Sequence, residues 1–302
     1  MWDFQRKKIS AVDLINIVFL SVVFVLYIFS LRNSPYIFGP PLVFFITAAV
    51  IWFAIRLRQK PEVNKAGKLF LTFYPLIYLF VIFESFFMIL PYVNLCRYDK
   101  ILADIDFSWF GVHPTVWIER FIHPGLTDLM YLLYIFYFPM PLFILVYLYK
   151  NKRFIELDKS VFIFMVVYYT AYIGYFIVPA SGPRFYEPLM QLQTKDLDGL
   201  FLSIPIRKII NFLEPNKLDA FPSLHSAISF TTMLVMVKYN KRMFWYFLPV
   251  IIGIFVSLVY CRYHYVVDIV AGVAWSMAGF IIGNRFYTKF AQGKTVSFIK
   301  DV

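Results

Sequence analysis

Residues 12–31 read VDLINIVFLSVVFVLYIFSL, twenty residues in which Asp13 is the one charged side chain. A helix of about 20 mostly apolar residues is long enough to cross the hydrocarbon core of a bilayer. The run is continuously apolar, whereas the strands of a membrane barrel alternate in hydrophobicity. It therefore predicts a transmembrane helix.

Comparable runs recur along the chain and predict an all-α integral membrane protein. The sixth run is short, so we expect its helix to begin inside the preceding loop. Pro75, Pro139 and Pro141 lie within runs, where kinks are tolerable if neighbouring helices cover the freed carbonyls. The eight predicted crossings are 12–31, 36–55, 69–90, 127–149, 160–179, 224–238, 243–260 and 264–283.

Composition agrees with this class. Of 302 residues, 61% are hydrophobic and 16% are charged, against about 25% charged in soluble domains. The formal net charge of +11 would suggest nucleic-acid binding in a soluble protein. In a membrane protein, Lys and Arg instead gather in cytoplasmic loops, so we expect the bilayer as partner and no nucleic acid.

The distribution of basic residues predicts the orientation. With a cytoplasmic N-terminus, the inner segments carry 19 of the 29 Lys and Arg residues and the outer segments carry 10. Both termini are therefore expected in the cytoplasm. Arg6-Lys7-Lys8 precedes the first run without a small-residue cleavage site, so that run is expected to be a transmembrane helix and not a signal peptide.

The crossings and loops divide the chain into four expected parts. Residues 1–90 form N-terminal transmembrane helices, and 91–126 form an outer interfacial segment. Residues 127–285 form a catalytic membrane domain with an outer loop at 180–223, and the fold as a whole is expected to have a six-helix core. Residues 286–302 form a cytoplasmic tail. Aromatic and charged residues mix in 94–125, and apolar residues recur at helical spacing in 202–213. Both stretches predict helices at the outer interface, either as covers of a site or as purely structural elements.

His264 and Asp268 are the first candidates for chemistry. Residues four apart on a helix share a face, and a carboxylate on one imidazole nitrogen leaves the other nitrogen basic. The pair would suit a nucleophile toward phosphorus or a general base. The alternative is a pair that only caps the eighth helix.

A second histidine follows in Phe221-Pro222-Ser223-Leu224-His225. Ser223 is a favourable N-cap for the sixth helix, and a helix start offers free N–H groups to a phosphate. His225 in the first turn could protonate a leaving oxygen. A satisfied interfacial histidine is the alternative.

Basic residues on the same outer side could hold a phosphoryl group. Arg184 follows the fifth crossing and could clamp such a group through two bonds, or simply anchor the chain at the interface. Arg262 would contact the anion only if the chain there is not yet helical. Cys96 and Cys261 lack metal-ligand spacing, and a disulfide between them stays open.

Taken together, these signals resemble the type 2 phosphatidic acid phosphatase superfamily, in particular its inositol phosphorylceramide synthase-like branch. The superfamily motifs are Lys-x6-Arg-Pro, Pro-Ser-Gly-His and Ser-Arg-x5-His-x3-Asp, and the resemblance covers about residues 165–285. It implies that His264 becomes phosphohistidine, Asp268 orients it, and His225 acts as acid and then base. It also implies that Arg184 binds phosphoryl oxygens, that Ser223 contributes through its motif position, and that no metal or cofactor is needed.

This chain departs from the motifs at several positions. Ile177 stands where the first motif has lysine, and Pro183 precedes the arginine where the family has proline after it. Leu224 replaces the glycine of the second motif, and Leu258 replaces the arginine of the third, although Ser257 is kept. Arg262 or Lys217 could compensate for the two missing cations.

Fewer cations suit a phosphodiester monoanion better than a monoester dianion. We therefore predict a phosphotransferase that moves a phosphoryl headgroup from a phospholipid donor to a lipid alcohol, with its site on the outer face. A phosphatase acting on a lipid monoester or pyrophosphate is the alternative, and a lipid or anion transporter is a remote one. The sequence does not predict the oligomeric state.

Overall fold

The computed structural model describes residues 9–213 and 217–295. Within them every regular element is a helix, and one isolated β-bridge joins Ala180 to Asp219. Among these described residues, six helices are long and apolar enough to cross a membrane, and a bent helix pair makes up to seven. The predicted class, an all-α multi-pass membrane protein, is confirmed. The orientation stays a prediction, and Arg6-Lys7-Lys8 and residues 296–302 lie outside the described residues.

The described chain falls into two compact units, each considered by itself. The first contains residues 9–93, 147–169 and 278–295, and the second contains 94–146 and 170–277 apart from the gap at 214–216. Three helices supply residues to both units: α8 (Met140–Lys150), α9 (Phe154–Ile177) and α14 (Val266–Thr295). The last of these continues well into the segment that the sequence predicted as a tail.

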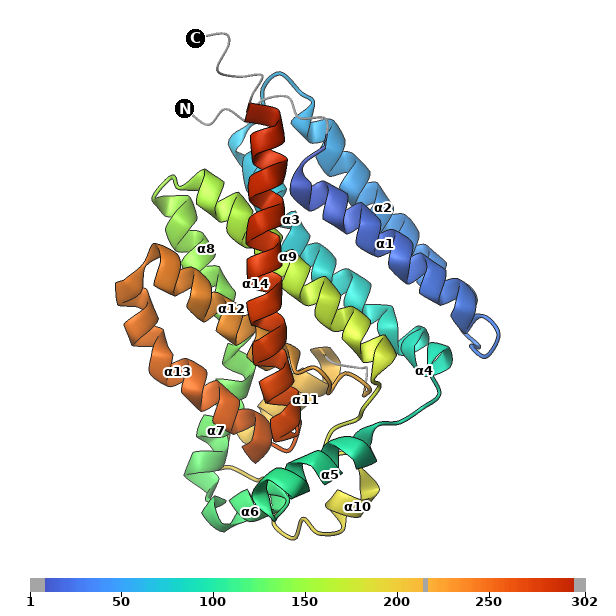
Figure 1. The fold of residues 1–302 in the computed structure, drawn as a ribbon, viewed down its shortest axis with the longest axis vertical. Helices are drawn as coiled ribbons and strands as arrows, with labels where there is room; N and C mark the ends of the chain where they lie inside the picture. Colours follow the sequence, from blue (N-terminus) through green and yellow to red (C-terminus); the bar gives the residue numbers. More distant parts are fainter. Residues whose placement is uncertain (1–8, 214–216, 296–302) are drawn as a thin grey trace. The chain divides into compact units, whose positions relative to one another are not determined.

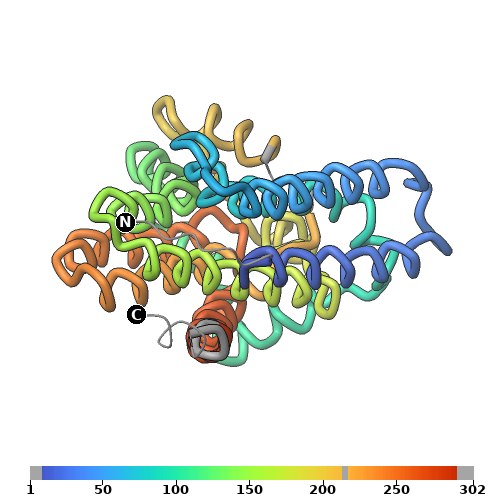
Figure 2. The backbone as a smooth tube through the Cα atoms, turned by 90° about the horizontal axis from the view of Figure 1, so that it is seen from above, coloured from blue at the N-terminus to red at the C-terminus, as the bar shows by residue number. Residues whose placement is uncertain are grey.

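The first unit contains the N-terminal helices, of which α1 and α2 run side by side (Figures 1 and 2). Ser10 caps α1 by accepting a bond from the Asp13 amide, and Asp13 bonds back to the Ser10 amide, which satisfies two amides at the helix start. Pro75 lies inside α3. The helices are α1 (Ala11–Ser30), α2 (Gly39–Arg58), α3 (Lys65–Glu84), η1 (Phe86–Met88) and α4 (Leu90–Val93).

Buried polar side chains tie these helices together. The guanidinium of Arg58 lies 3.1 Å from the carboxylate of Asp13, and the Tyr74 hydroxyl donates to the same carboxylate. Asn16 accepts a hydrogen bond of 2.5 Å from Tyr169 on α9. A charge in hydrocarbon is costly unless it is paired. The pairing of Asp13 with Arg58 therefore explains how both charged side chains can be buried.

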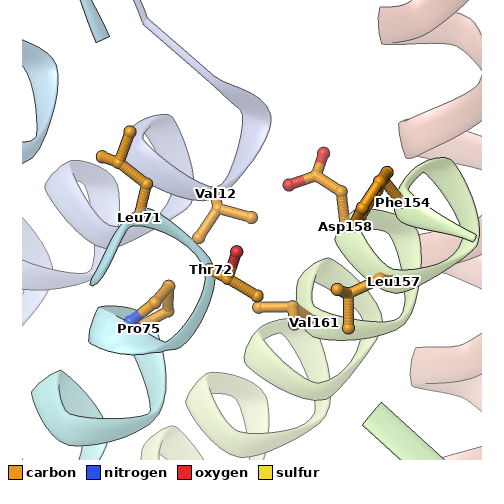
Figure 3. A pocket seen from close by; sticks show the side chains of 8 residues that line it. All are labelled: Val12, Leu71, Thr72, Pro75, Phe154, Leu157, Asp158 and Val161. Carbon is orange, nitrogen blue, oxygen red and sulfur yellow. The ribbon is translucent and has the colours of Figure 1, made fainter. Parts of the chain in front are cut away.

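A small pocket lies beside that network, between α1, α3 and α9 (Figure 3). Val12, Thr72 and Asp158 are among the lining side chains, and the pocket has room for about one water molecule. The Asp158 carboxylate accepts a hydrogen bond of 2.7 Å from Tyr287. The pocket is too small for a lipid headgroup.

The second unit contains the remaining helices. The fourth predicted crossing is bent by 47° between α7 and α8, near Pro139 and Pro141, where a kink is tolerable. Both predicted outer helices form, as α5 and α11. The helices are α5 (Asp99–Phe110), α6 (Pro114–Trp117), η2 (Ile118–Phe121), α7 (Pro124–Phe136), α10 (Glu187–Met190), α11 (Ser203–Leu213), α12 (Leu224–Tyr239) and α13 (Lys241–Tyr260).

One prediction about the sixth crossing is wrong. Its helix, α12, does not begin inside the preceding loop but at Leu224, where Ser223 caps it by accepting a bond from the Ser226 amide. With 16 residues, at about 1.5 Å rise each, it is shorter than a bilayer core is thick.

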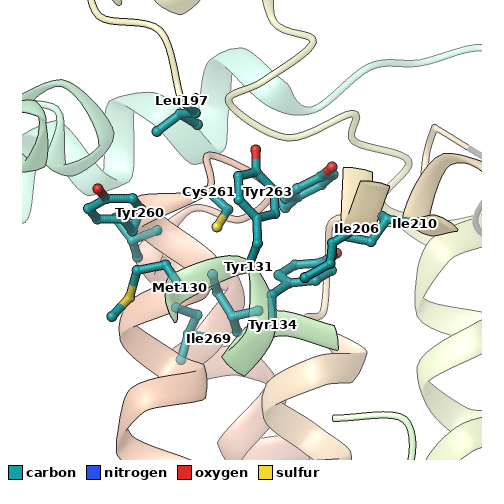
Figure 4. Close-up of a cluster of buried hydrophobic side chains, with 12 residues drawn as sticks. Met130, Tyr131, Tyr134, Leu197, Ile206, Ile210, Tyr260, Cys261, Tyr263 and Ile269 are labelled. Carbon is teal, nitrogen blue, oxygen red and sulfur yellow. The ribbon is translucent and has the colours of Figure 1, made fainter. Parts of the chain in front are cut away.

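An apolar core rich in tyrosine joins α7, α11 and the end of α13 (Figure 4). Ile206 and Ile210 on α11 pack against this core, beside Tyr131 and Tyr134 of α7. The other face of α11 exposes apolar side chains, including Phe212.

Candidate active site

His225 and His264 lie in direct contact although they are 39 positions apart. His225 is in the first turn of α12, and His264 is in the loop before α14. Nε2 of His264 lies 3.3 Å from Nδ1 of His225, and both side chains are buried. The structure therefore brings together the two imidazoles that sequence analysis selected.

The other ring nitrogen of His264 fixes its protonation. Nδ1 lies 3.0 Å from the carbonyl oxygen of Ala220 and 3.5 Å from a carboxylate oxygen of Asp268. A carbonyl can only accept a hydrogen bond, so Nδ1 carries a proton, and in the neutral imidazole Nε2 then keeps its lone pair. In this arrangement Nδ1 of His225 donates to Nε2 of His264.

Asp268 has two contacts, one with the His264 imidazole and one with the backbone at the start of α14. Its carboxylate lies beside His264, but the shorter contact is with the amide of Tyr265, at 2.8 Å. Asp268 therefore holds the backbone of the residue that follows His264, and its carboxylate also lies beside the His264 imidazole. The capping role and the proximity to His264 both occur.

Close packing of α12 against α14 sets the distance between the histidines. The Ser223 amide donates to the carbonyl of Asp268 at 3.1 Å. The Ser226 hydroxyl contacts the carbonyls of Ser223 and Ile269, at 3.0 and 3.1 Å. Ser223 therefore acts here as a helix cap and as a contact between the two motifs.

Aromatic rings from α7 and from Tyr137, the residue that follows it, surround His225. Sequence analysis missed this surrounding. The ring centroids of Tyr134 and Tyr137 lie 4.4 and 4.2 Å from that of His225. Tyr131, Tyr134 and Tyr137 recur every three residues, a spacing that places them on one side of α7. That spacing was visible in the sequence, but nothing local indicated which helix it would contact.

Arg184 reaches this group through tyrosines. Its guanidinium donates to the hydroxyls of Tyr131 and Tyr263, at 3.2 and 3.0 Å. The ring of Tyr263 lies 4.7 Å from that of Tyr134, which in turn contacts His225. A continuous chain of contacts therefore links Arg184 to the histidines.

Arg262 is engaged elsewhere. The chain at Arg262 is not helical, as its positive φ of 65° confirms, so the condition for reaching an anion is met. Its guanidinium, however, lies 2.6 Å from the Glu119 carboxylate and 2.6 Å from the carbonyl of Lys195. Burial lowers the pKa of Arg262 and Glu119 opposes that shift.

Lys217 packs against another aromatic side chain. Its ammonium lies 5.2 Å from the centroid of the Phe185 ring, and 3.5 Å from the side-chain oxygen of Asn211. Among the described residues, no three His, Cys, Asp or Glu side chains are grouped to hold a metal. Cys96 and Cys261 are free thiols, so the open question of a disulfide between them is answered.

Four acidic residues from the predicted outer segment and the start of α7 accept hydrogen bonds from segments further along the chain. Sequence analysis also missed these contacts. Asp128 accepts hydrogen bonds from four successive amides at the start of α11. Glu119 accepts from Thr194 as well as Arg262. Asp99 and Asp106 bond to the loops that carry the motif residues, as described below. The acidic residues were visible in the sequence, but their partners lie 72 to 166 positions away.

A helical membrane protein whose two buried imidazoles meet at helix starts, next to a carboxylate, has the features of a membrane enzyme. The PAP2 superfamily model matches residues 101–282, and the chain belongs to this superfamily. The resemblance stated from the three motifs is thereby confirmed, and so is the prediction of an enzyme of this superfamily.

One curated protein shows more specific similarity. Over 188 residues the chain is 24% identical to the phosphoinositol dihydroceramide synthase of Bacteroides thetaiotaomicron, and the alignment covers 58% of each chain. This chain therefore spans less than two thirds of that relative's length. No solved structure matches the chain.

Proposed function

We propose that this protein is a phosphotransferase that moves a phosphoryl headgroup from a phospholipid to a lipid alcohol through a phosphohistidine. The observation that carries the proposal is the placement of His264: Nδ1 is held by the Ala220 carbonyl, and the basic Nε2 faces His225 at 3.3 Å. A nucleophile beside a proton donor is what phosphoryl transfer to nitrogen requires.

In the first half-reaction, Nε2 of His264 attacks the phosphorus of the donor diester. The N–P bond forms, the bond from phosphorus to the diacylglycerol oxygen breaks, and His225, in its imidazolium form, gives that oxygen a proton and becomes neutral. Asp268 stabilises the positive charge that develops on the His264 ring. Acid–base assistance of this kind contributes about 10²–10⁴-fold in rate.

In the second half-reaction, His225 removes the proton from the acceptor hydroxyl. The acceptor oxygen attacks phosphorus, the N–P bond breaks, and His264 regains its lone pair. The products are diacylglycerol and the acceptor lipid carrying the headgroup phosphate. Each histidine ends in its starting state, so the cycle balances without a metal or an external base.

Substrate entry must separate the two histidines. Reacting atoms in a near-attack geometry lie about 3–3.5 Å apart. Nδ1 of His225 already lies at such a distance, 3.3 Å, from Nε2 of His264. A phosphorus atom would take that place. We therefore expect the His225 ring to shift within its aromatic surroundings when the donor binds.

The charge of the site favours a diester donor. Arg184 is the basic residue of the family motifs that this chain retains, while Ile177 and Leu258 occupy the other two basic positions. A diester carries one negative charge and needs less compensation than a monoester dianion. The name of the Bacteroides relative supports a phosphoinositol headgroup and a ceramide-type acceptor.

The test uses purified protein in liposomes with headgroup-labelled phosphatidylinositol, with and without ceramide. We expect labelled product lipid only with ceramide, and abolition by His264→Ala and by His225→Ala. His123→Asn is the matched control, because this exposed histidine caps α7 and asparagine also caps helices. Acceptor-independent release of labelled headgroup would instead identify a hydrolase, and full activity of His264→Ala would refute the phosphohistidine.

A further inference from the structure

Asp99 is a buried carboxylate at the start of α5 that bonds to two separate loops. It accepts hydrogen bonds from the Ser181 amide at 2.9 Å, the Ser181 hydroxyl at 3.1 Å and the Gly182 amide at 2.9 Å. It also accepts a bond of 3.1 Å from the Tyr265 hydroxyl. One carboxylate thus collects four donors from segments more than 80 positions apart.

Each of the two loops carries a residue of the proposed mechanism. Ser181 and Gly182 come just before Arg184, and Tyr265 comes directly after His264. Burial and the neighbouring carboxylate of Asp99 raise the pKa of Tyr265, so its hydroxyl stays protonated and donates. Asp99 is therefore bonded on one side to the Arg184 loop and on the other to the His264 loop.

The Arg184 loop also lies close to the backbone of Tyr263. Gly182 has a φ of +80°, and a Cβ atom there would lie 2.2 Å from the backbone oxygen of Tyr263. The Tyr263 hydroxyl in turn accepts a hydrogen bond from the guanidinium of Arg184. The loop is held between the Asp99 carboxylate and the backbone of Tyr263, which leaves it little freedom to shift.

We propose that Asp99 is a positioning residue that sets the separation between the Arg184 guanidinium and the His264 imidazole. The catalytic consequence rests on the proposed function, whereas the link between the two loops does not. A carboxylate is suited to this task because it has about four acceptor positions. An asparagine offers one acceptor oxygen, and its amide group would face other N–H groups.

Asp106, seven residues further along α5, has a related role. It accepts hydrogen bonds from the Val266 and Val267 amides, at 2.7 and 2.9 Å, and so holds the start of α14 next to His264. Asp104 on the same helix provides a matched control, because it is exposed and pairs with Lys100, at 2.7 Å. Both results place α5 as the support of the two motif loops.

The experiment is a double-mutant cycle on the transfer reaction from phosphatidylinositol to ceramide. Asp99→Asn should lower kcat/KM by about 10- to 100-fold, and adding it to Arg184→Lys should cost much less than the product of the two single losses, since residues that act through one another are not additive. Asp104→Asn should stay within twofold of wild type. Strictly multiplicative losses, or a near-normal Asp99→Asn, would overturn the proposal.

Tyr265→Phe keeps the test decisive if Asp99→Asn does not fold. It leaves the carboxylate and the Arg184 loop intact and removes only the bond to the His264 loop. We expect kcat to fall three- to tenfold with the donor KM within twofold, and an unchanged kcat would contradict the proposal.

Hydrogen exchange separates this proposal from the proposed function. In Asp99→Asn, backbone amides at 181–182 should exchange faster than in wild type and in Asp104→Asn, whatever reaction the protein catalyses. Faster exchange in Asp99→Asn, found together with a wild-type protein that has no transferase activity, would refute the proposed function and keep the link. Unchanged exchange would refute the link itself.

Discussion

A Cβ atom on Gly272 would lie 2.4 Å from the backbone carbonyl oxygen of Ser223. Glycine at this position allows α14 to approach the start of α12, and with it His264 to approach His225. The carbonyl belongs to the backbone and cannot rotate away, so any larger residue must push the two helices apart.

Gly272→Ala is therefore expected to impair both stability and activity. Overpacking of this kind costs about 1–3 kcal/mol, and we expect transfer activity to fall at least tenfold. Gly125→Ala is the control, because its nearest contact to an added Cβ is 3.7 Å. Thermal unfolding in detergent and the transfer assay measure the two effects, and equal behaviour of the two variants would contradict the packing argument.

The aromatic rings around His225 lead to a prediction about water. Tyr137→Leu removes a ring whose centroid lies 4.2 Å from that of His225, and so opens the site to solvent. Because an excluded site protects reactive intermediates from hydrolysis, the ratio of free headgroup phosphate to transferred product should rise several-fold. Product analysis with ceramide present measures this ratio. Tyr246→Leu, at an exposed position on α13, should leave the ratio unchanged, and so should Tyr137→Leu if the ring does not exclude water.

Arg184 should contribute to binding of the donor phosphate. Arg184→Gln removes charge-assisted hydrogen bonds worth about 1.5–3 kcal/mol each, so we expect kcat/KM to fall about 10- to 100-fold. Arg184→Lys should recover part of this, since lysine keeps the charge but not the paired donors. Arg120→Gln, at an exposed arginine that lies over Trp117, is the control. Equal losses in both glutamine variants would indicate general electrostatics and not a specific contact.

Arg262 and Glu119 form a largely buried ion pair at 2.6 Å. Removing one partner leaves an uncompensated charge and typically costs about 3–5 kcal/mol. Glu119→Gln should therefore lower the thermal unfolding temperature with little change in donor KM, and the double variant Glu119→Gln/Arg262→Met should regain part of the loss. An Arg262→Met variant of normal stability but with a greatly raised donor KM would instead support phosphate binding by Arg262.

The two cysteines allow the predicted orientation to be tested. Cys96 is exposed and Cys261 is buried. Burial also raises the pKa of Cys261, so less of the reactive thiolate forms. In intact cells or right-side-out vesicles, a membrane-impermeant maleimide should label the wild type but not Cys96→Ser. Labelling only after the membrane is opened would place the Cys96 segment, and the expected outer loops, on the cytoplasmic side.

Helix positions were largely predictable, because their signals are local. Apolar run length indicated most of the membrane helices, although eight crossings were predicted and six or up to seven helices in the described residues are long and apolar enough. Ser223 marked the start of α12. The misjudged start of the sixth helix had a different origin. There, membrane thickness was given more weight than the capping serine, and the structure follows the cap.

The candidate site divides in the same way. The residue types and order of Arg184, His225, His264 and Asp268 indicated phosphoryl chemistry, since each type has few other uses at a membrane surface. Which nitrogen of His264 is protonated could not be read from them, because the deciding partner is a backbone carbonyl 44 positions away. Backbone acceptors have no sequence signature.

Along the chain alone, the membrane class, the helix limits and the reactive side chains are already specified, because hydrophobic length, capping and side-chain chemistry depend on near neighbours. Three-dimensional packing decides the rest: the 3.3 Å contact of the histidines, the pairing of Arg262 with Glu119, and the link from Asp99 to two loops. Such contacts join segments far apart in sequence, and each of these side chains has many other possible partners in the residues between those segments.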